Sequence, residues 1–467
     1  MQFSQIPSHV LDLAREVRAA GGRGLLVGGC VRDQLMGRQP KDWDLEVYGI
    51  EPNELRALLD RFGSVNVIGE AFAIYKLGHD LDVSLPRKER KSGRGHHAFV
   101  IEGDPHLSYF EAARRRDFTV NAILQDPMTG EIIDPHGGRS DIEQRLLRAV
   151  STDTFAEDSL RVLRAAQFAA RFEFEITPDT AALCRGIDLS DLPSERIWGE
   201  FEKILLQAPR PSLGLEGLQT LGAVDQLFPE ISSLRDVPQD PDWHPEGDVY
   251  KHTLLVVDRA RDLVDDLSYP KQVTVMLAAV AHDFGKPSTT EFVEGRWRSR
   301  GHEEAGVAPT ERFLDQLNIH TIAGYDVRSQ VVALVREHLK PGEFHKKRDE
   351  VKDAAFRRLS RRCELDLLYR VAKADSLGRN APWVPRERWY DAEAQEWFIA
   401  RARELAVEEQ PPKPILMGRH LLQLGLTPGP RIGQITAAVY EMQLDGRIST
   451  LEQAQAVARE LIAAENS

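Results

Sequence analysis

The 467-residue sequence is poor in cysteine, has no long apolar run and lacks an excess of positive charge. Its three cysteines, Cys30, Cys184 and Cys363, are widely spaced and form no CxxC pair, which argues against a disulfide framework and a zinc ribbon. No stretch approaches the roughly 18 apolar residues that a membrane helix needs, and the N-terminus lacks the apolar core of a signal peptide. We therefore expect a cytoplasmic protein with no membrane partner.

The net charge limits the kind of nucleic-acid partner. A formal charge of −13 argues against a protein that coats nucleic acid, because binding to a polyanion depends mostly on positive charge. Any RNA contact must therefore be local. One basic cluster meets this need, although a charge run is as often a solvated loop. It comprises Arg87, Lys88, Arg90, Lys91, Arg94, His96 and His97, and it resumes at Arg114, Arg115 and Arg116.

A change of pattern near residue 150 divides the chain. A chain of this length is expected to form roughly two to four domains. From residue 24 to about 135, short apolar strands alternate with helical segments; beyond 150, the pattern is almost wholly helical. Linkers rich in proline and glycine lie near residues 210, 240 and 410. These features predict an α+β protein, with a small α/β head over 1–145 followed by all-α parts over 146–225, 226–405 and 406–467.

Two aspartates separated by one residue, Asp42 and Asp44, form the first candidate site. In a β-strand this spacing places both carboxylates on the same face, where their oxygens suit Mg²⁺. Asp82, in a neighbouring predicted strand, is either a third carboxylate of the site or a solvent-facing residue. Gly28 ahead of these aspartates allows close approach of a triphosphate. The segment therefore indicates metal-dependent phosphoryl or nucleotidyl transfer.

At these residues the chain resembles nucleotidyltransferases with a polymerase-β-like head, and more narrowly the class II bacterial CCA tRNA nucleotidyltransferases. The resemblance extends over nearly the full length. The first family motif is matched by Gly28, Gly29, Val31, Arg32, Asp33, Asp42 and Asp44. The second is matched by Arg115, Arg116, Asp117, Phe118, Thr119, Asn121 and Ala122. The third and fifth are matched by Asp134, Gly137 and Asp141, and by Glu195, Arg196 and Glu200.

The fourth motif, EDSLRVLR, is the most discriminating. It is predicted to place Asp158, Arg161 and Arg164 three residues apart on one helical face, where a simple surface ion pair is the alternative. The resemblance implies that Asp158 and Arg161 act as a protein template for the incoming base. A carboxylate accepts from the amino group of cytosine or adenine and faces a carbonyl oxygen in uracil or guanine. Gln167 departs from the pattern, because many relatives have arginine there.

The resemblance therefore implies a set of site residues in the head and neck. Asp42 and Asp44 would be catalytic and would bind Mg²⁺. The predicted nucleotide-binding residues are Gly29, Arg32, Arg115, Arg116, Asp117, Asn121, Asp158, Arg161 and Arg164. The C-terminal segment resembles the tRNA-facing helices of these enzymes.

Histidines and aspartates farther along the chain form a second candidate site. Alone, each histidine would most often be structural, but His282 and Asp283 end an apolar helix together. Their order resembles the HD superfamily of metal-dependent phosphohydrolases. Mixed imidazole and carboxylate donors favour Mn²⁺, Ni²⁺, Co²⁺ or Fe²⁺. The implied ligands are His252, His282, Asp283 and Asp375, with His302 and His338 as candidate ligands of a second ion.

The resemblance implies an enzyme that adds C, C and A to tRNA 3′ ends from CTP and ATP. The HD domain implies phosphatase, 2′-nucleotidase or 2′,3′-cyclic phosphodiesterase activity. An A-adding or CC-adding tRNA enzyme, or a poly(A) polymerase, has the same motifs. From another class, an RNA-binding HD phosphohydrolase with an inactive head is the further alternative. The oligomeric state is open.

Overall fold

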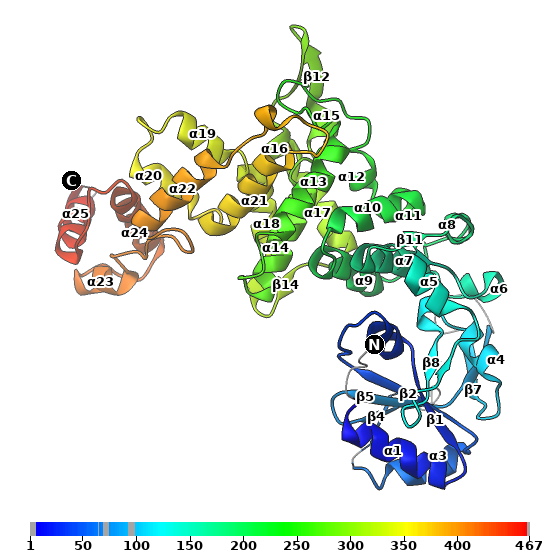
Figure 1. Cartoon of the computed structure of the whole chain (residues 1–467). Helices are drawn as coiled ribbons and strands as arrows, with labels where there is room; N and C mark the ends of the chain where they lie inside the picture. Colours follow the sequence, from blue (N-terminus) through cyan, green and yellow to red (C-terminus); the bar gives the residue numbers. More distant parts are fainter. Residues whose placement is uncertain (1–5, 64, 69–73, 92–98, 465–467) are drawn as a thin grey trace. The chain divides into compact units, whose positions relative to one another are not determined.

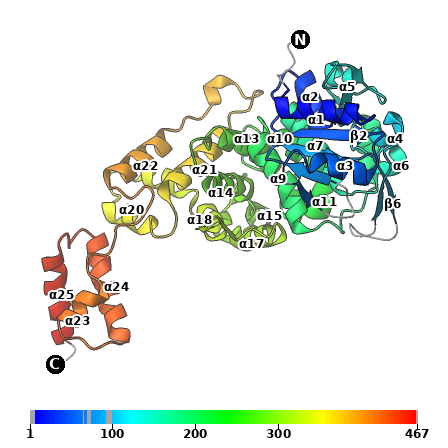
Figure 2. The same ribbon diagram turned by 90° about the horizontal axis from the view of Figure 1, so that it is seen from below.

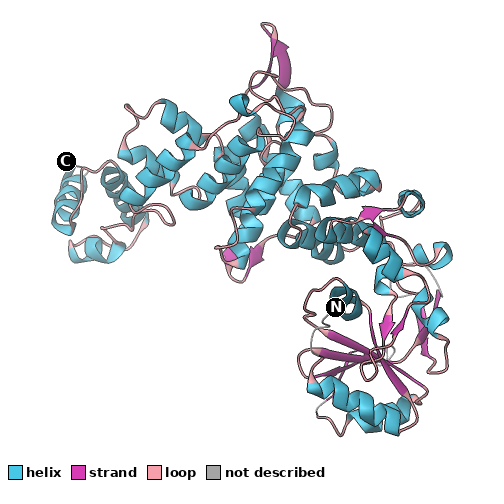
Figure 3. Cartoon of the chain, viewed as in Figure 1, coloured by secondary structure: helices cyan, strands magenta, loops and turns pink. Residues whose placement is uncertain are grey.

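The computed structural model describes residues 6–63, 65–68, 74–91 and 99–464 (Figure 1). The chain divides into two compact units, Met1–Leu227 and Phe228–Ser467. None of the helices in the described residues is both long and apolar enough to span a bilayer. The predicted α+β class is confirmed, because the larger sheet lies in the head and helices dominate the rest (Figure 3). The finer division into four parts stays a prediction.

One seven-stranded sheet forms the centre of the first unit. Its strands are β1 (Arg23–Val27), β2 (Trp43–Tyr48), β3 (Val65–Ile68), β4 (Ile74–Leu77), β5 (Leu81–Ser84), β8 (Leu124–Gln125) and β9 (Ile132–Ile133). Their order across the sheet is β3-β4-β5-β2-β1-β8-β9. Neighbouring strands are antiparallel except β2 and β5, which run parallel. The parallel pair therefore brings the starts of these two strands together.

Helices pack on both faces of this sheet. They are α1 (Ser8–Ala19), α2 (Gly29–Leu35), α3 (Pro52–Leu59) and α4 (Tyr109–Arg114). Because side chains alternate along a strand, Leu26 of β1 packs with α1, α2 and α3, whereas Leu25 and Val27 pack with α4. The sheet is therefore buried between two apolar layers.

A bundle of helices completes the first unit. Its elements are α5 (Gly138–Gln144), β10 (Leu146–Leu147), α6 (Thr152–Phe155), α7 (Leu160–Phe172), β11 (Glu175–Ile176), α8 (Pro178–Arg185), α9 (Ser194–Gln207), α10 (Pro211–Thr220) and α11 (Ala223–Leu227). Helix α7 is buried along most of its length against α9 and α10. Gly214 and Gly217 of α10 allow this close packing. A Cβ atom at Gly214 would lie 2.4 Å from Ile204, and one at Gly217 would lie 3.2 Å from Ala166.

Helix α14 (Tyr269–Ala281) forms the centre of the second unit. Every residue from Val273 to Ala281 is buried, because α13 (Val249–Arg261), α18 (Val327–Glu337) and α21 (Leu365–Gly378) pack against it. The other elements up to the tail are α12 (Pro229–Ser232), α15 (Lys286–Thr289), β12 (Thr290–Val293), β13 (Arg296–Ser299), α16 (His302–Ala305), α17 (Val307–Gln316), β14 (Thr321–Ile322), β15 (Tyr325–Asp326), α19 (Lys340–Lys346), α20 (Asp353–Leu359), η2 (Arg386–Arg388) and α22 (Glu393–Glu404).

The C-terminal helices α23 (Gly418–Gln423), α24 (Pro430–Leu444) and α25 (Leu451–Ala464) form a small core of their own (Figure 2). Leu421, Val439 and Ala458 are among its buried residues. Charged side chains join this core to α20, since Arg358 lies 3.2 Å from Glu441 and 2.6 Å from Asp445. The tail is therefore attached through polar contacts as well as through the chain.

Two local departures from the predicted pattern have clear causes. The hairpin β12–β13 lies in a region predicted to be helical. Its turn residues Glu294 and Gly295 both have positive φ, 53° and 78°, as a type I′ turn requires, but Glu-Gly is a weaker signal than Asn-Gly. The basic cluster begins in a strand, because β6 (Arg87–Lys91) pairs with β7 (Phe99–Gly103). The cluster members Arg94, His96 and His97 lie outside the described residues.

Candidate active sites

The two predicted catalytic aspartates lie at the start of β2. Asp44 belongs to the strand, whereas Asp42 precedes it by one residue, so the predicted strand geometry applies to Asp44 alone. Asp82 of β5 is the register partner of Asp44, and its buried Oδ1 has no hydrogen-bond partner among the described residues. Burial raises the pKa of Asp44; Arg116 opposes this, and Asp82 and Asp42 raise it again. These mutually repelling carboxylates fit a divalent cation.

A pocket of about 320 Å³ opens beside Asp44. Gly28, which has a φ of 73° and precedes α2, lies at its wall. A Cβ atom there would be 3.0 Å from Nη1 of Arg116 and 3.6 Å from Oδ2 of Asp44, so glycine leaves the approach to both groups open. The described lining residues are Gly28, Gly29, Arg32, Asp44, Arg116, Asp117, Asn121, Arg164, Gln167, Phe168, Arg171 and Lys203.

A chain of hydrogen bonds connects three of the sequence motifs across this pocket. Arg32 donates to Oδ1 of Asn121 at 2.6 Å, and Asn121 donates to Oδ1 of Asp117 at 2.9 Å. Nε and Nη2 of Arg164 reach Oδ2 of Asp117 at 2.8 and 2.6 Å. Burial would raise the pKa of Asp117, but Arg164, Asn121 and the amide of Phe118 hold it below its ordinary value. Asp117 is therefore an ionised link between the head and helix α7.

Sequence reasoning missed Glu46, which anchors the arginines of the second motif. Its buried carboxylate accepts a hydrogen bond from Nη2 of Arg115 at 2.8 Å and one from the hydroxyl of Tyr48 at 2.6 Å. Arg116 lies 3.7 Å from the same carboxylate. The signal was present, because Glu46 is two residues beyond Asp44 on one strand and so shares its face.

Asp158 and Arg161, the residues predicted to read the incoming base, do not lie where the sequence pattern predicts. Helix α7 begins at Leu160, so the expectation that Asp158 shares a helical face with Arg161 and Arg164 is wrong. Arg161 is buried and donates to the backbone carbonyls of Thr154 and Arg115, at 2.7 and 2.6 Å. Among the described residues no direct contact joins the side chains of Asp158 and Arg161; Asp158 pairs instead with Arg196 of α9, at 3.1 Å.

The third and fifth motifs brace the site from two sides. Thr119 donates to Asp141 of α5 at 2.6 Å, which ties the third motif to the second. Gly138 permits this contact, since a Cβ atom there would lie 2.1 Å from the carbonyl oxygen of Thr119. On the other side, Glu200 of α9 pairs with Lys203 at 2.8 Å and lies 3.9 Å from Arg164. Both motifs therefore position residues of the pocket.

Six of the nine predicted nucleotide-binding residues line the pocket, and Arg115, Asp158 and Arg161 do not. Gln167 does line it, and its buried Nε2 has no hydrogen-bond partner among the described residues. Sequence reasoning missed Arg171, although its spacing of seven residues from Arg164 places both on one face of α7. Burial lowers the pKa of Arg171, and Arg32 lowers it further. The pocket therefore holds closely spaced positive charges, and a bound anion would reduce the repulsion between them.

In the second site, three histidines are oriented by backbone carbonyls three residues earlier. Nδ1 of His282, His302 and His338 lies 2.8, 2.7 and 2.7 Å from the carbonyl oxygens of Ala279, Ser299 and Val335. His282 and His338 follow α14 and α18 directly, where the last carbonyls of a helix lack intrahelical partners. This leaves Nε2 of each ring for another partner, the arrangement found in metal-binding histidines.

All six predicted ligands of the second site come together. His252 lies 3.1 Å from Asp375, while His302 lies 3.4 Å from Asp283 and 3.3 Å from His338. In each of two sets of three residues, the ligand atoms lie within 4.8 Å of one another, and Asp283 belongs to both sets. These sets are His252, His282 and Asp283, and Asp283, His302 and His338.

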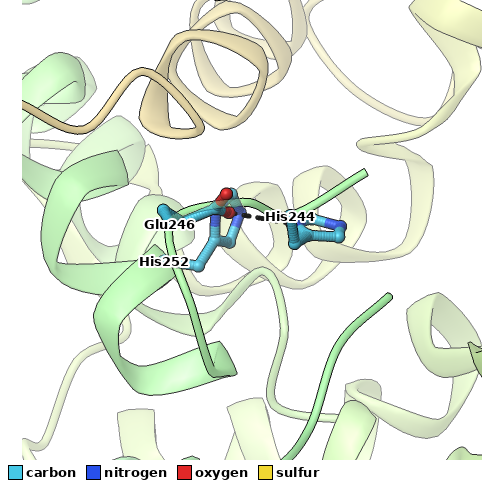
Figure 4. Close-up of side chains that lie close together, drawn as sticks. All are labelled: His244, Glu246 and His252. Carbon is cyan, nitrogen blue, oxygen red and sulfur yellow. Dashed lines mark hydrogen bonds and ion pairs between the residues drawn. The ribbon is translucent and has the colours of Figure 1, made fainter. Parts of the chain in front are cut away.

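Sequence reasoning missed His244 and Glu246, two residues that lie close to His252 (Figure 4). One oxygen of the buried Glu246 carboxylate lies 2.7 Å from Nδ1 of His252 and 2.9 Å from Nδ1 of His244. Glu246 thereby orients His252 so that its Nε2 faces Asp375. Sequence spacing does not reveal this contact, because residues 238–247 form an irregular loop.

The charge states of Asp283 and His338 suit metal binding. Burial would raise the pKa of Asp283, but His282 and Lys286 hold it well below the ordinary range. Burial, aided by His302 and His282, lowers the pKa of His338 to about 3. Nε2 of His282 is buried and has no hydrogen-bond partner among the described residues. Ionised carboxylates and neutral imidazoles are the forms that bind a divalent metal.

Comparison with known proteins matches the two sites to two kinds of domain. Residues 25–148 match the Poly A polymerase head domain, residues 173–234 the probable RNA and SrmB-binding site of polymerase A, and residues 249–380 the HD domain. The fold and sites thus define a nucleotidyltransferase joined to an HD domain. The Multifunctional CCA protein of Xanthomonas campestris pv. campestris (strain B100) is 36% identical over 400 residues, covering 82% of this chain and 92% of that protein. The chain therefore belongs to the multifunctional CCA protein family, a family of tRNA nucleotidyltransferases.

Other relatives and solved structures agree with this assignment. The Multifunctional CCA protein of Pasteurella multocida (strain Pm70) is 39% identical over 309 residues, covering 64% of this chain and 71% of that protein. The CCA-adding enzyme of Bacillus stearothermophilus in complex with CTP has a TM-score of 0.65 at 19% identity, covering 99% of this chain and all (100%) of that one. The CCA-adding enzyme of Thermotoga maritima complexed with tRNA has a TM-score of 0.58 at 18% identity, with coverages of 99% and 100%. At these identities the structures establish the shared fold.

Proposed function

We propose that the chain adds C, C and A to tRNA 3′ ends from CTP and ATP. The observation that carries this proposal is one pocket in which the carboxylate of Asp44 and the cationic residues of the second and fourth motifs meet. CCA-adding enzymes of the same fold have been solved with CTP, with ATP and with tRNA, which supports these substrates. An A-adding or CC-adding enzyme would have the same residues and would differ in its product.

The proposed reaction follows from the positions of the charges. Asp42, Asp44 and Asp82 would hold Mg²⁺, which stabilises negative charge on the attacking and leaving oxygens. Arg32, Arg164 and other cations of the pocket would bind the triphosphate. The tRNA 3′ hydroxyl loses its proton to solvent as its oxygen forms a bond to the α-phosphorus. The bond from that phosphorus to the oxygen shared with the β-phosphate breaks, and pyrophosphate leaves.

The test is an incorporation assay. Purified protein is incubated with tRNA that lacks its CCA end and with labelled CTP alone, ATP alone or both. We expect CTP alone to give a product two residues longer and both nucleotides to give one three residues longer. Absence of incorporation would reject the proposal. A product that stays two residues longer with both nucleotides would identify a CC-adding enzyme, and repeated A would identify a poly(A) polymerase.

We also propose that the second site is a metal-dependent phosphohydrolase active on phosphomonoesters and 2′,3′-cyclic phosphates. The shared ligand Asp283 and the two ligand sets around it support binding of two divalent ions, and the nitrogen-rich donors favour Mn²⁺, Ni²⁺, Co²⁺ or Fe²⁺. Such ions supply Lewis-acid activation of water and phosphate. Lys286 and Arg379 line the same pocket and would bind the phosphate oxygens.

A pair of variants separates the two activities. We expect Asp44→Ala to abolish nucleotide addition and to preserve hydrolysis of 2′,3′-cyclic AMP with added Mn²⁺. His282→Ala should have the opposite effect. Loss of both activities in a folded variant would contradict two independent sites, and hydrolysis without any addition by the unaltered protein would identify an inactive head.

The nucleotide substrates and the three free, buried cysteines support a cytoplasmic location.

A further inference from the structure

Two exposed tryptophans line the pocket of the second site, which has a volume of about 390 Å³. Trp243 is 54% exposed and Trp297 is 37% exposed, whereas most large apolar side chains of this unit are buried. The other described lining residues are mainly charged or polar, and Leu339 is the one aliphatic residue among them. Exposed aromatic rings beside charged groups indicate a ligand with a flat ring rather than an aliphatic chain.

The two tryptophans come from different segments that ion pairs hold together. Trp243 lies in the loop before α13, and Trp297 lies in β13 of the hairpin that extends from this unit (Figure 1). Arg296, next to Trp297, lies 3.5 Å from Asp242 and 3.9 Å from Asp240 of that loop. The hairpin and the loop are therefore connected beside the pocket.

The rings also have supports of their own. Phe292 is the cross-strand partner of Trp297 and meets it edge to face, with centroids 5.0 Å apart. In the loop, Gln239 accepts a hydrogen bond from Lys286 at 2.7 Å, and Lys286 lies 2.8 Å from the ligand Asp283. The aromatic rim is thus connected through Lys286 to the predicted metal centre.

We propose that Trp297 and Trp243 bind the nucleobase of the substrate, while its phosphate lies at the predicted metal ligands. This assignment rests on the proposed phosphohydrolase activity and adds a specificity to it. Aromatic side chains stack on any nucleobase, and Arg296 and Arg298 beside them contribute positive charge toward RNA phosphates. The preferred substrate would be a nucleotide or an RNA end that carries a base, rather than a simple phosphate ester.

The test compares a substrate with a base and one without. KM and kcat are measured with Mn²⁺ for 2′,3′-cyclic AMP and for glycerol 1,2-cyclic phosphate. We expect Trp297→Ala to raise KM for the nucleotide by roughly 5- to 100-fold, with kcat within about twofold, because stacking contributes binding at each base. Values for glycerol cyclic phosphate should not change. Trp297→Phe should restore most of the affinity, and Trp243→Ala should act in the same direction as Trp297→Ala.

Trp389→Ala is the matched control, because Trp389 is 40% exposed and is absent from the described lining. Equal effects of Trp297→Ala on both substrates, or no effect on either, would overturn the assignment while leaving the phosphohydrolase proposal intact. If the unaltered protein hydrolyses neither substrate, the phosphohydrolase proposal fails. In that case, calorimetry measures the affinity for adenosine 2′-monophosphate in the presence of Mn²⁺, which tests the two tryptophans without hydrolysis. Equal affinities of the unaltered protein and Trp297→Ala would reject the assignment of the tryptophans.

Discussion

Arg196 of α9 holds the carboxylate of Asp158, the residue predicted to read the incoming base. Nη2 of Arg196 lies 3.2 and 3.1 Å from Oδ1 and Oδ2 of Asp158. The amide of Leu160 also donates to Asp158, at 3.2 Å. Both contacts fix the position of the carboxylate through its acceptor oxygens. The fifth motif therefore positions Asp158 of the fourth, and through it we expect an effect on base choice.

We predict that Arg196→Gln weakens discrimination between nucleotides. Without the guanidinium, the carboxylate of Asp158 is less constrained, and the incorporation of UTP or GTP relative to CTP should rise by about tenfold, since one well-placed base contact discriminates by about 1–3 kcal/mol. Single-nucleotide incorporation with each triphosphate measures this ratio. The control is Arg185→Gln, an exposed arginine of α8 that donates to the carbonyl of Thr220. Unchanged selectivity in Arg196→Gln would refute a positioning role.

A second prediction concerns the glycine at the wall of the first pocket. Gly28→Ala places a methyl group against Arg116 and Asp44 and strains a backbone with φ of 73°, so nucleotide addition should fall by at least about 100-fold. Gly130→Ala separates the two effects, because Gly130 has φ of 75° but nothing within 4 Å of the added Cβ. Both variants should lose about 1 kcal/mol of stability from backbone strain. An equal loss of activity in the two would show that strain alone matters.

Asp82 provides a third prediction. Asp82→Asn removes a charge opposite Asp44, so we expect addition to fall by roughly 100-fold and to require more Mg²⁺ for half-maximal rate. Titration of the rate with Mg²⁺ measures both quantities. Asp80→Asn is the control, because Asp80 lies two residues earlier and its side chain is 42% exposed. If the two variants behave alike, Asp82 is a solvent-facing strand residue with no part in metal binding.

A fourth prediction concerns the stability of the head at low pH. The buried carboxylate of Asp126 accepts hydrogen bonds from Arg18 at 2.9 Å, from Arg23 at 3.1 Å and from the amide of Met128 at 2.9 Å. Burial would raise the pKa of Asp126, but these donors hold it below 3.8. Asp126→Asn should therefore lower the free energy of unfolding at neutral pH by about 1–3 kcal/mol.

The sign of the pH dependence follows from the lowered pKa. A carboxyl group whose pKa is lower in the folded protein stabilises the fold above its unfolded pKa and loses this contribution as pH falls through the folded pKa. The difference between the protein and Asp126→Asn should thus narrow as pH falls below about 5. Denaturant unfolding followed in this range measures it, with the exposed Asp12→Asn as control. A constant difference would contradict the prediction.

Much of the first site could be predicted because its residues lie in short segments with a recognisable spacing. The confirmed assignments are those of fold class and family, and the structure brings together residues that local motifs identify, such as Arg32, Asp117 and Arg164. One prediction was wrong because the start of a helix was not recognised. The spacing predicts Asp158 on α7, but the helix begins two residues later, and Asp158 accepts a hydrogen bond from the amide of its first residue, Leu160.

Residues that depend on long-range contacts could not be predicted. Glu246 reaches His252 from an irregular loop, and Trp243 meets the pocket only after that loop is joined to the hairpin. Neither contact leaves a periodic signal in the sequence. By contrast, Glu46 could have been predicted, because it lies two residues after Asp44 on the same strand, β2. Local spacing identifies side chains that lie on the same helix or strand. Contacts between side chains on different elements can be identified only in the folded structure.

The carbonyl contacts of His282, His302 and His338 have a consequence for evolution. Each ring is oriented by an oxygen only three residues earlier in its own segment, in addition to the contact of 3.3 Å between His302 and His338. Replacement of one histidine leaves the carbonyl contacts of the other two in place. Single substitutions in descendants of this chain can therefore alter the predicted metal site while the fold that nucleotide addition requires is retained.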